Sequence, residues 1–310
     1  MQYNLVVQKS YKVTSNTSAV TAVLISVLCW GGAGAASKLS LRNVDAYNLI
    51  FYSNLVALLM LFVLIVISKQ TKQLFGFSKK DYIFFAVQGA LGMFLYRIFF
   101  NLGIGYSNAQ EAFIANYMWP IFLVLFGVYA NKEKISLVRM SFLMLSFMGI
   151  VIVVIGSVID LFKVENLVGD GLAVVAAALF AFYSFRNRPS YNKLIFTFHC
   201  YMFATIFSFF TLSLSDNRAF VSDAKWGYLF LGIFVLAIAN FSWTYAVEHG
   251  NRYLISNISF LTPVISLIAI TVLVKEKFLI TSLLGTVLVI LGLFLQSLYV
   301  RKSRQTQKKV

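Results

Sequence analysis

Aromatic side chains with polar tips gather around a proline in one apolar stretch of the sequence. Asn116, Tyr117 and Trp119 directly precede Pro120, and Tyr96 lies in the apolar stretch before it. Tyrosine and tryptophan combine a flat face, on which another ring can stack, with a polar tip that needs a hydrogen-bond partner. With the carboxamide of Asn116, they suit a small molecule that has an apolar body and an amino-acid head.

Other apolar stretches carry side chains of the same kinds, and a binding cavity needs several stretches to converge. The further candidates for substrate binding are Trp30, Phe180, Tyr183, Trp243 and Asn257. Tyrosines near the ends of apolar stretches have another explanation, because aromatic side chains also anchor helices at the membrane surface.

Charged side chains inside the apolar stretches are few. Arg97 and Glu111 lie in consecutive stretches that a short turn joins. We expect them to form an ion pair near the outer mouth of the bundle, and proton coupling is the alternative.

The common catalytic and metal-binding motifs are absent from the sequence. No GxxxxGK[ST], HExxH or GxSxG pattern occurs, and two histidines leave little for a zinc site. We therefore expect no catalytic residue, no metal and no cofactor, and predict that the protein is not an enzyme.

The elements that must position these residues follow from composition. Of the 310 residues, 60% are hydrophobic and 12% are charged, whereas about 25% are charged in soluble domains. The apolar residues form blocks of about 20, the length that a membrane-spanning helix needs. Because helices and closed barrels alone satisfy the backbone in lipid, and no strand-like alternation occurs, we predict an all-α membrane protein with ten transmembrane helices. The blocks cover approximately residues 19–39, 46–67, 82–105, 109–130, 136–157, 168–187, 192–214, 225–246, 253–274 and 279–299.

The positive charges predict how the chain crosses the membrane. With ten spans both termini lie on one side, and placing that side in the cytoplasm puts 18 Lys and Arg residues inside and seven outside. The net charge of +15 is thus explained by topology. We expect the basic tail, residues 300–310, to rest on anionic lipid headgroups, and we expect no nucleic-acid partner.

Two segments of the sequence repeat one layout with an offset of 143 residues. Pro120 corresponds to Pro263, the Lys-Glu-Lys turn at 132–134 to that at 275–277, and Gly89 and Gly149 to Gly232 and Gly292. The first helices align with an offset of about 150. We predict two five-helix repeats, 19–157 and 168–299, preceded by a cytoplasmic segment 1–18. The second repeat is inverted because five is odd. Chance alignment of apolar sequence is the alternative, and the Lys-Glu-Lys turns are expected to be solvated.

The two matched prolines predict irregular backbone inside the membrane. A proline within a helix frees the carbonyl group four residues earlier, here that of Asn116 or Ser259. Such a group is tolerated where it faces protein or a polar cavity. Pro120 and Pro263 therefore predict helix breaks beside a central pathway, and a simple packing kink is the alternative.

These features resemble a known family. Two five-helix halves of EamA type, each with a proline in its fourth helix, are similar to the drug/metabolite transporter superfamily. More narrowly, E-A-F-I-A-N-Y-M-W-P at 111–120, and W-x5-H-G-N at 243–251 with F-L-T-P at 260–263, resemble segments of the YddG-type aromatic amino acid exporters.

The resemblance implies an inner-membrane carrier whose central cavity opens alternately to either side. It matches the cavity aromatics of that family to Tyr96, Tyr117 and Trp119, whereas Arg97 stands where an acidic residue can occur. We therefore predict an exporter of aromatic or hydrophobic amino acids or related metabolites, a possible monomer whose partners are a small-molecule substrate and membrane lipid. The alternatives are an importer of another metabolite, such as an S-adenosyl compound, and a membrane scaffold that transports nothing.

Overall fold

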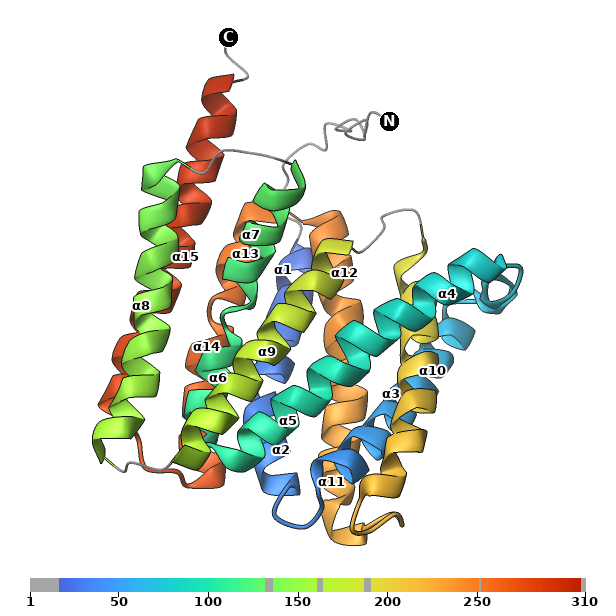
Figure 1. Cartoon of the computed structure of the whole chain (residues 1–310). Coiled ribbons are helices and arrows are strands. Elements are labelled where there is room, and N and C mark those ends of the chain that lie inside the picture. Colours follow the sequence, from blue (N-terminus) through green and yellow to red (C-terminus); the bar gives the residue numbers. More distant parts are fainter. Residues whose placement is uncertain (1–16, 132–135, 161–163, 187–190, 251, 308–310) are drawn as a thin grey trace.

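The computed structural model describes residues 17–131, 136–160, 164–186, 191–250 and 252–307. These residues form helices and turns, with no strand among them (Figure 1). The first half contains α1 Thr17–Gly31, α2 Ala33–Ser40, α3 Ala46–Ile67, η1 Thr71–Leu74, α4 Lys79–Gln88, η2 Gly89–Leu95, α5 Tyr96–Tyr106, α6 Ala109–Asn116, α7 Trp119–Asn131 and α8 Leu137–Asp160. The second contains α9 Val164–Arg186, α10 Lys193–Thr211, η3 Leu212–Leu214, η4 Ser222–Ala224, α11 Lys225–Leu229, η5 Phe230–Ile238, α12 Ala239–His249, α13 Arg252–Ser259, α14 Thr262–Ala269, η6 Ile270–Val274 and α15 Ile280–Gln307. The elements η2, η5 and η6 are π-helical, and the other η elements are 3-10 turns.

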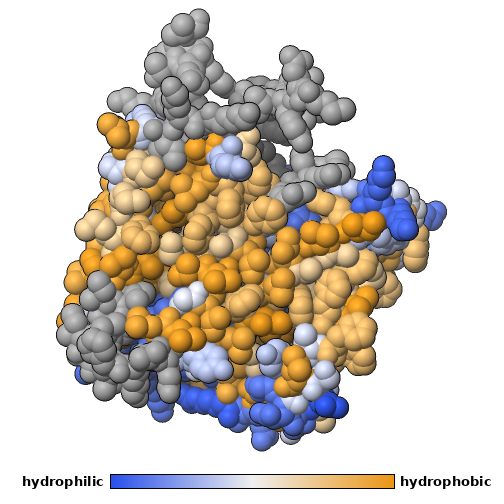
Figure 2. Space-filling view, viewed as in Figure 1, coloured by the Kyte–Doolittle hydropathy of each residue, from blue (hydrophilic) through white to orange (hydrophobic). Residues whose placement is uncertain are grey.

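Eight helical segments of the described residues are long and apolar enough to cross a membrane. They are Thr17–Ser40, Ala46–Ile67, Lys79–Tyr106, Ala109–Ala130, Asn166–Phe185, Lys193–Leu214, Ser222–Val247 and Ile280–Tyr299. Two further apolar helices, Met140–Ile152 and Thr262–Val274, are shorter. Figure 2 shows apolar residues in a broad band across the molecule, with hydrophilic residues toward its ends. The chain is therefore a multi-pass helical membrane protein, and the count of ten spans stays a prediction.

Helices from the two halves of the sequence pack against each other. The most extensive contacts join α8 to α15, α5 to α9, α3 to α10 and α1 to α12. Many contacts have a counterpart in the other half: α10 packs on η2 as α3 packs on η5, and α9 packs on α6 and α7 as α1 packs on α13 and α14. The start of α1 and the end of α15 lie at the same end of the bundle (Figure 1).

The contact between α8 and α15 is reciprocal. A Cβ atom at Gly149 would lie 2.6 Å from the carbonyl oxygen of Gly285, and one at Gly292 would lie 2.6 Å from that of Phe142. Gly292 follows Gly149 by 143 residues and Gly285 follows Phe142 by the same number, so the two contacts exchange when the offset is applied. Midway between them, the Ser146 hydroxyl donates a 3.2 Å hydrogen bond to the carbonyl of Val289, again 143 residues away. The two helices thus present the same surface to each other.

A two-residue turn interrupts the helix just before each proline. Residues 117–118 separate α6 from α7, and residues 260–261 separate α13 from α14, so both breaks occur 143 residues apart. The turns are closed by short-range bonds such as Tyr117 N–H to Ile114 C=O at 2.9 Å and Leu261 N–H to Ile258 C=O at 3.0 Å.

The structure differs here from a proline inside a continuous helix. Pro120 and Pro263 are each the second residue of a new helix. Proline is favoured at this place because the first helical N–H groups have no partner within the helix. A proline also lacks the N–H that would bond to the carbonyl four residues earlier, and its ring clashes with that carbonyl, so the preceding helix cannot continue through it.

Candidate functional site

Tyr96, the first residue of α5, contacts aromatic rings of its own helix and of α9. Its ring lies 5.1 Å from the ring of Phe180 on α9 and stacks at 5.8 Å on Phe100, one turn along α5. Its hydroxyl accepts a 3.4 Å hydrogen bond from the side-chain amide of Asn116, the last residue of α6. The break after α6 therefore brings a carboxamide to the tip of a tyrosine whose ring contacts two others.

Three more of the predicted residues join this group. Trp119, the first residue of α7, meets Phe180 edge to face, with ring centres 5.4 Å apart. The ring centre of Tyr183 lies 6.0 Å from that of Phe180. Tyr117, in the break, has its ring centre 5.8 Å from that of Phe113 and lies close to Tyr96. We call the set formed by Tyr96, Asn116, Tyr117, Trp119, Phe180 and Tyr183 the aromatic cluster; it joins α5, α6, α7 and α9.

The other two predicted tryptophans contact each other. Trp30 on α1 and Trp243 on α12 form a pair with ring centres 5.4 Å apart. Trp30 and Phe180 differ by 150 residues, the offset that aligns the first helices of the two halves. Trp30 thus holds the position in the first half that Phe180 of the aromatic cluster holds in the second. The side chain of Asn257 lies outside the described residues.

Arg97 is buried beside the aromatic cluster, and its partners do not include Glu111. Its side chain is 4% exposed and donates a 3.0 Å hydrogen bond to the side-chain oxygen of Asn54 on α3. The hydroxyl groups of Tyr96 and Tyr201 are its electrostatic neighbours. Sequence reasoning did not select Asn54 or Tyr201.

Glu111 lies in the first turn of α6, just beyond the far end of α5. Its carboxylate accepts hydrogen bonds from Asn108 at 2.9 Å and from Ser107 at 3.4 Å. Ser107 follows Arg97 by ten residues, or about 15 Å along a helix. The expected Arg97–Glu111 pair is therefore not brought together, because the two side chains lie at different depths.

A network of polar side chains closes that end of the bundle. The Lys38 ammonium on α2 donates to the carbonyls of Ile104 and Ser107, both at 2.7 Å. The Ser107 hydroxyl donates to buried Asp170 on α9 at 2.7 Å. The Glu276 carboxylate accepts from the backbone N–H of Ala109 at 3.1 Å, at the start of α6. We call the set formed by Lys38, Ser107, Glu111, Asp170 and Glu276 the end cluster.

The expectation of a solvated turn is wrong for Glu276. Its carboxylate also accepts from the backbone N–H of Gln110 at 3.4 Å, so it holds the first turn of α6. The N-terminus of a helix attracts a carboxylate, because its first N–H groups are unpaired and the helix dipole is positive there.

Changing Glu276 to glutamine should loosen this end of the bundle. The neutral amide keeps an acceptor but loses the charge, and hydrogen bonds to charged groups are worth about 1.5–3 kcal/mol against about 1 for neutral ones. We expect a loss of about 1 kcal/mol, measured as a lower melting temperature of the purified protein. Asp223→Asn, at an exposed residue of η4, is the control and should leave the melting temperature unchanged. Equal shifts of the melting temperature in both variants would show that Glu276 does not stabilise the N-terminus of α6.

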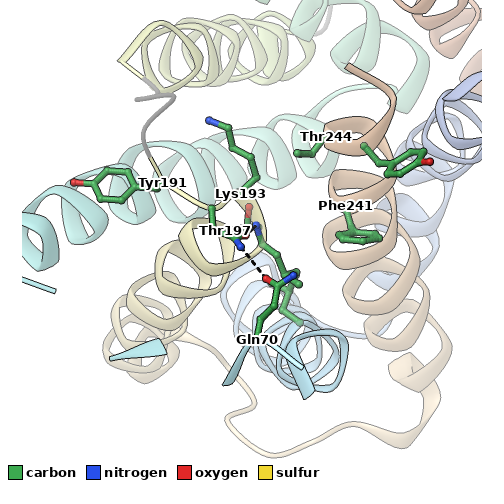
Figure 3. Close-up of a pocket in the computed structure, with 10 residues that line it drawn as sticks. Gln70, Tyr191, Lys193, Thr197, Phe241 and Thr244 are labelled. Carbon is green, nitrogen blue, oxygen red and sulfur yellow. Dashed lines mark hydrogen bonds between the residues drawn. The ribbon is translucent and has the colours of Figure 1, made fainter. Parts of the chain in front are cut away.

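Two of the hollows among the described residues lie toward opposite ends of the bundle. Figure 3 shows the first, of about 330 Å³, where α10 contributes Lys193 and Thr197 and α12 contributes Phe241 and Thr244. Asn192 donates to Gln70 across it at 2.8 Å. The second, of about 420 Å³, lies between α2 and α11, at the same end of the bundle as the end cluster. None of the predicted binding residues is among the described residues that line either hollow.

The fold and the site define a multi-pass helical membrane protein whose two halves pack through matching contacts. It has a helix break in each half and a partly buried aromatic cluster beside the first break. Comparison with known proteins makes the class specific. The chain belongs to the EamA-like transporter family, whose sequence profile matches residues 17–155 and 167–298. It is accordingly a transporter and not an enzyme by family.

Relatives with assigned names agree with this family. Two proteins of Archaeoglobus fulgidus, each named an uncharacterized transporter, are 24% and 25% identical and cover 87% and 90% of this chain and 95% and 97% of their own length. A protein of Ancylobacter novellus named aromatic amino acid exporter YddG is 23% identical over 60% of this chain and 66% of its own length. A crystal structure of another protein shares the fold, with a TM-score of 0.68 at 19% identity over 93% of this chain and 99% of the other.

Proposed function

We propose that this protein resides in the inner membrane and exports aromatic or other hydrophobic amino acids, or related metabolites. The observation that carries the proposal is the aromatic cluster, where ring faces and polar tips from four helices meet beside a helix break. The exporter name of the Ancylobacter novellus relative favours the same substrate class.

Alternating access by two inverted five-helix repeats, residues 19–157 and 168–299, is the mechanism we propose. Support comes from the reciprocal contacts of Gly149 and Gly292 and from helix breaks that occur 143 residues apart. Inverted repeats commonly let a transporter rock around a fixed site near mid-depth. In this arrangement the chain crosses the membrane ten times, and the segment 1–18 and the tail 300–310 are both cytoplasmic. We propose a monomer that binds its substrate and lipid but no nucleic acid.

The substrate would occupy the aromatic cluster after a modest separation of its rings. Trp119, Tyr117 and Tyr96 would stack on or cap the side chain, and the carboxamide of Asn116 with nearby carbonyl groups would take the ammonium group. Tyr183 would complete this wall. Trp30, Trp243 and Asn257 would line the opposite half, and the breaks at Pro120 and Pro263 would supply free backbone groups.

Flux from proteoliposomes tests the function directly. Vesicles that contain the full chain are loaded with labelled phenylalanine, tryptophan, threonine or methionine, and we expect saturable loss of the aromatic amino acids above that from protein-free vesicles. No flux of any amino acid from vesicles with folded protein would reject the proposal.

The direction of transport is tested in cells. Cells that express the protein should tolerate a toxic phenylalanine analogue at higher concentrations than control cells, because export lowers its internal level. Greater sensitivity would instead indicate uptake.

A further inference from the structure

Arg97 is a buried cation without an acidic partner among the described residues. It is 4% exposed, its side chain donates a hydrogen bond to the neutral carboxamide of Asn54, and its electrostatic neighbours are tyrosine hydroxyls. Charged side chains inside membrane-spanning helices are costly and almost always pair with another group. A structural role in a salt bridge therefore does not account for this arginine.

The groups around Arg97 offer more donors than acceptors. A guanidinium group carries five N–H donors, and Asn54 accepts one of them at 3.0 Å. Asn54 is fully buried, and its own side-chain N–H2 has no hydrogen-bond partner in the described structure. The hydroxyl of Tyr201, 1% exposed, is a further possible donor. An excess of buried donors beside a positive charge is the arrangement that an anion would satisfy.

Arg97 also lies at a suitable depth and next to the aromatic cluster. It is ten residues, about 15 Å, before Ser107 at the end of α5, which is half of a hydrocarbon core of about 30 Å. Tyr96, its neighbour in sequence, belongs to the aromatic cluster. A bound molecule could thus place a ring in the cluster and an acidic group at Arg97.

The other half of the chain has no equivalent charge. The offset of 143 residues takes Arg97 to Asn240, whose side-chain amide donates to the Leu236 carbonyl of its own helix at 2.7 Å. The positive charge is therefore a feature of one half, which suits recognition of one end of an asymmetric molecule rather than maintenance of the shared architecture.

We propose that Arg97, with Asn54 and Tyr201, forms a carboxylate-binding site at mid-depth of the membrane. The guanidinium group would bind the carboxylate through two parallel N–H bonds, and the free amide of Asn54 would add a third. This inference rests on the proposed function in that it names the acidic end of the transported molecule. It predicts that carboxylates are substrates and that the matching amines without a carboxylate are not.

The wild-type protein tests the site without any substitution. Phenylalanine and 3-phenylpropionate should raise the melting temperature of the purified full chain, because a ligand that binds the folded state stabilises it. Phenethylamine, which keeps the ring and the amine but lacks the carboxylate, should raise it little at the same concentration. Equal stabilisation by phenethylamine and phenylalanine would overturn the proposal.

Three substitutions, one at Asn54 and two at Arg97, separate binding from folding. Asn54→Asp places a carboxylate beside the guanidinium group, so it should preserve or raise the melting temperature while weakening phenylalanine binding on the order of 100-fold. Arg97→Gln should weaken it by a similar factor, and Arg97→Lys should restore part of it. Unchanged phenylalanine binding in Asn54→Asp would overturn the site.

Failure of this inference and failure of the proposed function give different results. Carboxylate-dependent stabilisation without any amino-acid flux would keep the Arg97 site and reject amino-acid export. Phenylalanine flux that Asn54→Asp leaves unchanged would keep export and reject the Arg97 site.

Discussion

Leucine at Gly149 or at Gly292 should separate α8 from α15 and strongly destabilise the protein. At each position an added Cβ would lie 2.6 Å from a backbone carbonyl oxygen of the other helix, that of Gly285 or of Phe142. Backbone cannot turn away as a side chain can, so the helices must move apart. Overpacking costs about 1–3 kcal/mol where side chains can adjust, and we expect more than 3 kcal/mol here. The measurement is the melting temperature, or the folded fraction in mild detergent.

The seam between α8 and α15 offers a control within the same chain. Gly105 on α5 has no atom within 4 Å of an added Cβ. Gly105→Leu should therefore be close to neutral, or slightly stabilising because glycine weakens a helix. Because the seam is reciprocal, the losses at Gly149 and Gly292 should be similar. A large loss at one and none at the other would contradict the reciprocal contact.

Alanine at Trp119 should weaken the transport of aromatic substrates on the order of tenfold. Its ring and that of Phe180 meet edge to face, and it is the first residue after the helix break. One aromatic contact is worth about 0.5–1.5 kcal/mol beyond the area it buries, and about 1.4 kcal/mol corresponds to a tenfold change in affinity. The measurement is the concentration dependence of tryptophan and methionine flux. The apparent KM should rise for tryptophan and change little for methionine, which has no ring.

Trp226→Ala makes the same chemical change at a different place. Trp226 on α11 is 72% exposed and lies outside the aromatic cluster. Transport by this variant should match that of the unchanged protein. If Trp226→Ala and Trp119→Ala affect tryptophan flux alike, then the aromatic cluster is not the binding site.

Local sequence patterns were sufficient to predict the helical class and much of the aromatic cluster. Apolar blocks of about 20 residues predict helices without reference to other parts of the chain. Asn116, Tyr117 and Trp119 could be selected because they lie beside a proline in the middle of an apolar block. Their partner Phe180 was also among the candidates, although it carries no polar tip and is one of 31 phenylalanines.

The contacts that local patterns could not predict join residues far apart in the sequence. Arg97 meets Asn54, 43 residues away, and Glu276 meets Ala109, 167 residues away. The short turn between their apolar stretches suggested Glu111 as the partner of Arg97. The two lysines that flank Glu276 suggested that its carboxylate is solvated. Asp170 could not be predicted for the same reason: its partner Ser107 lies in the turn between α5 and α6, 63 residues earlier.

The pairing of α1 with α12, α3 with α10, α5 with α9 and α8 with α15 has a consequence for how the chain folds. Each pair takes one helix from residues before 161 and one from residues after 163, so the two sequence halves are not independent folding units. While the first half is synthesised alone, Gly149 and Ser146 lack the α15 backbone that they contact in the complete chain. Assembly of the native bundle must therefore wait for the second half, and the two halves should unfold together as one cooperative unit.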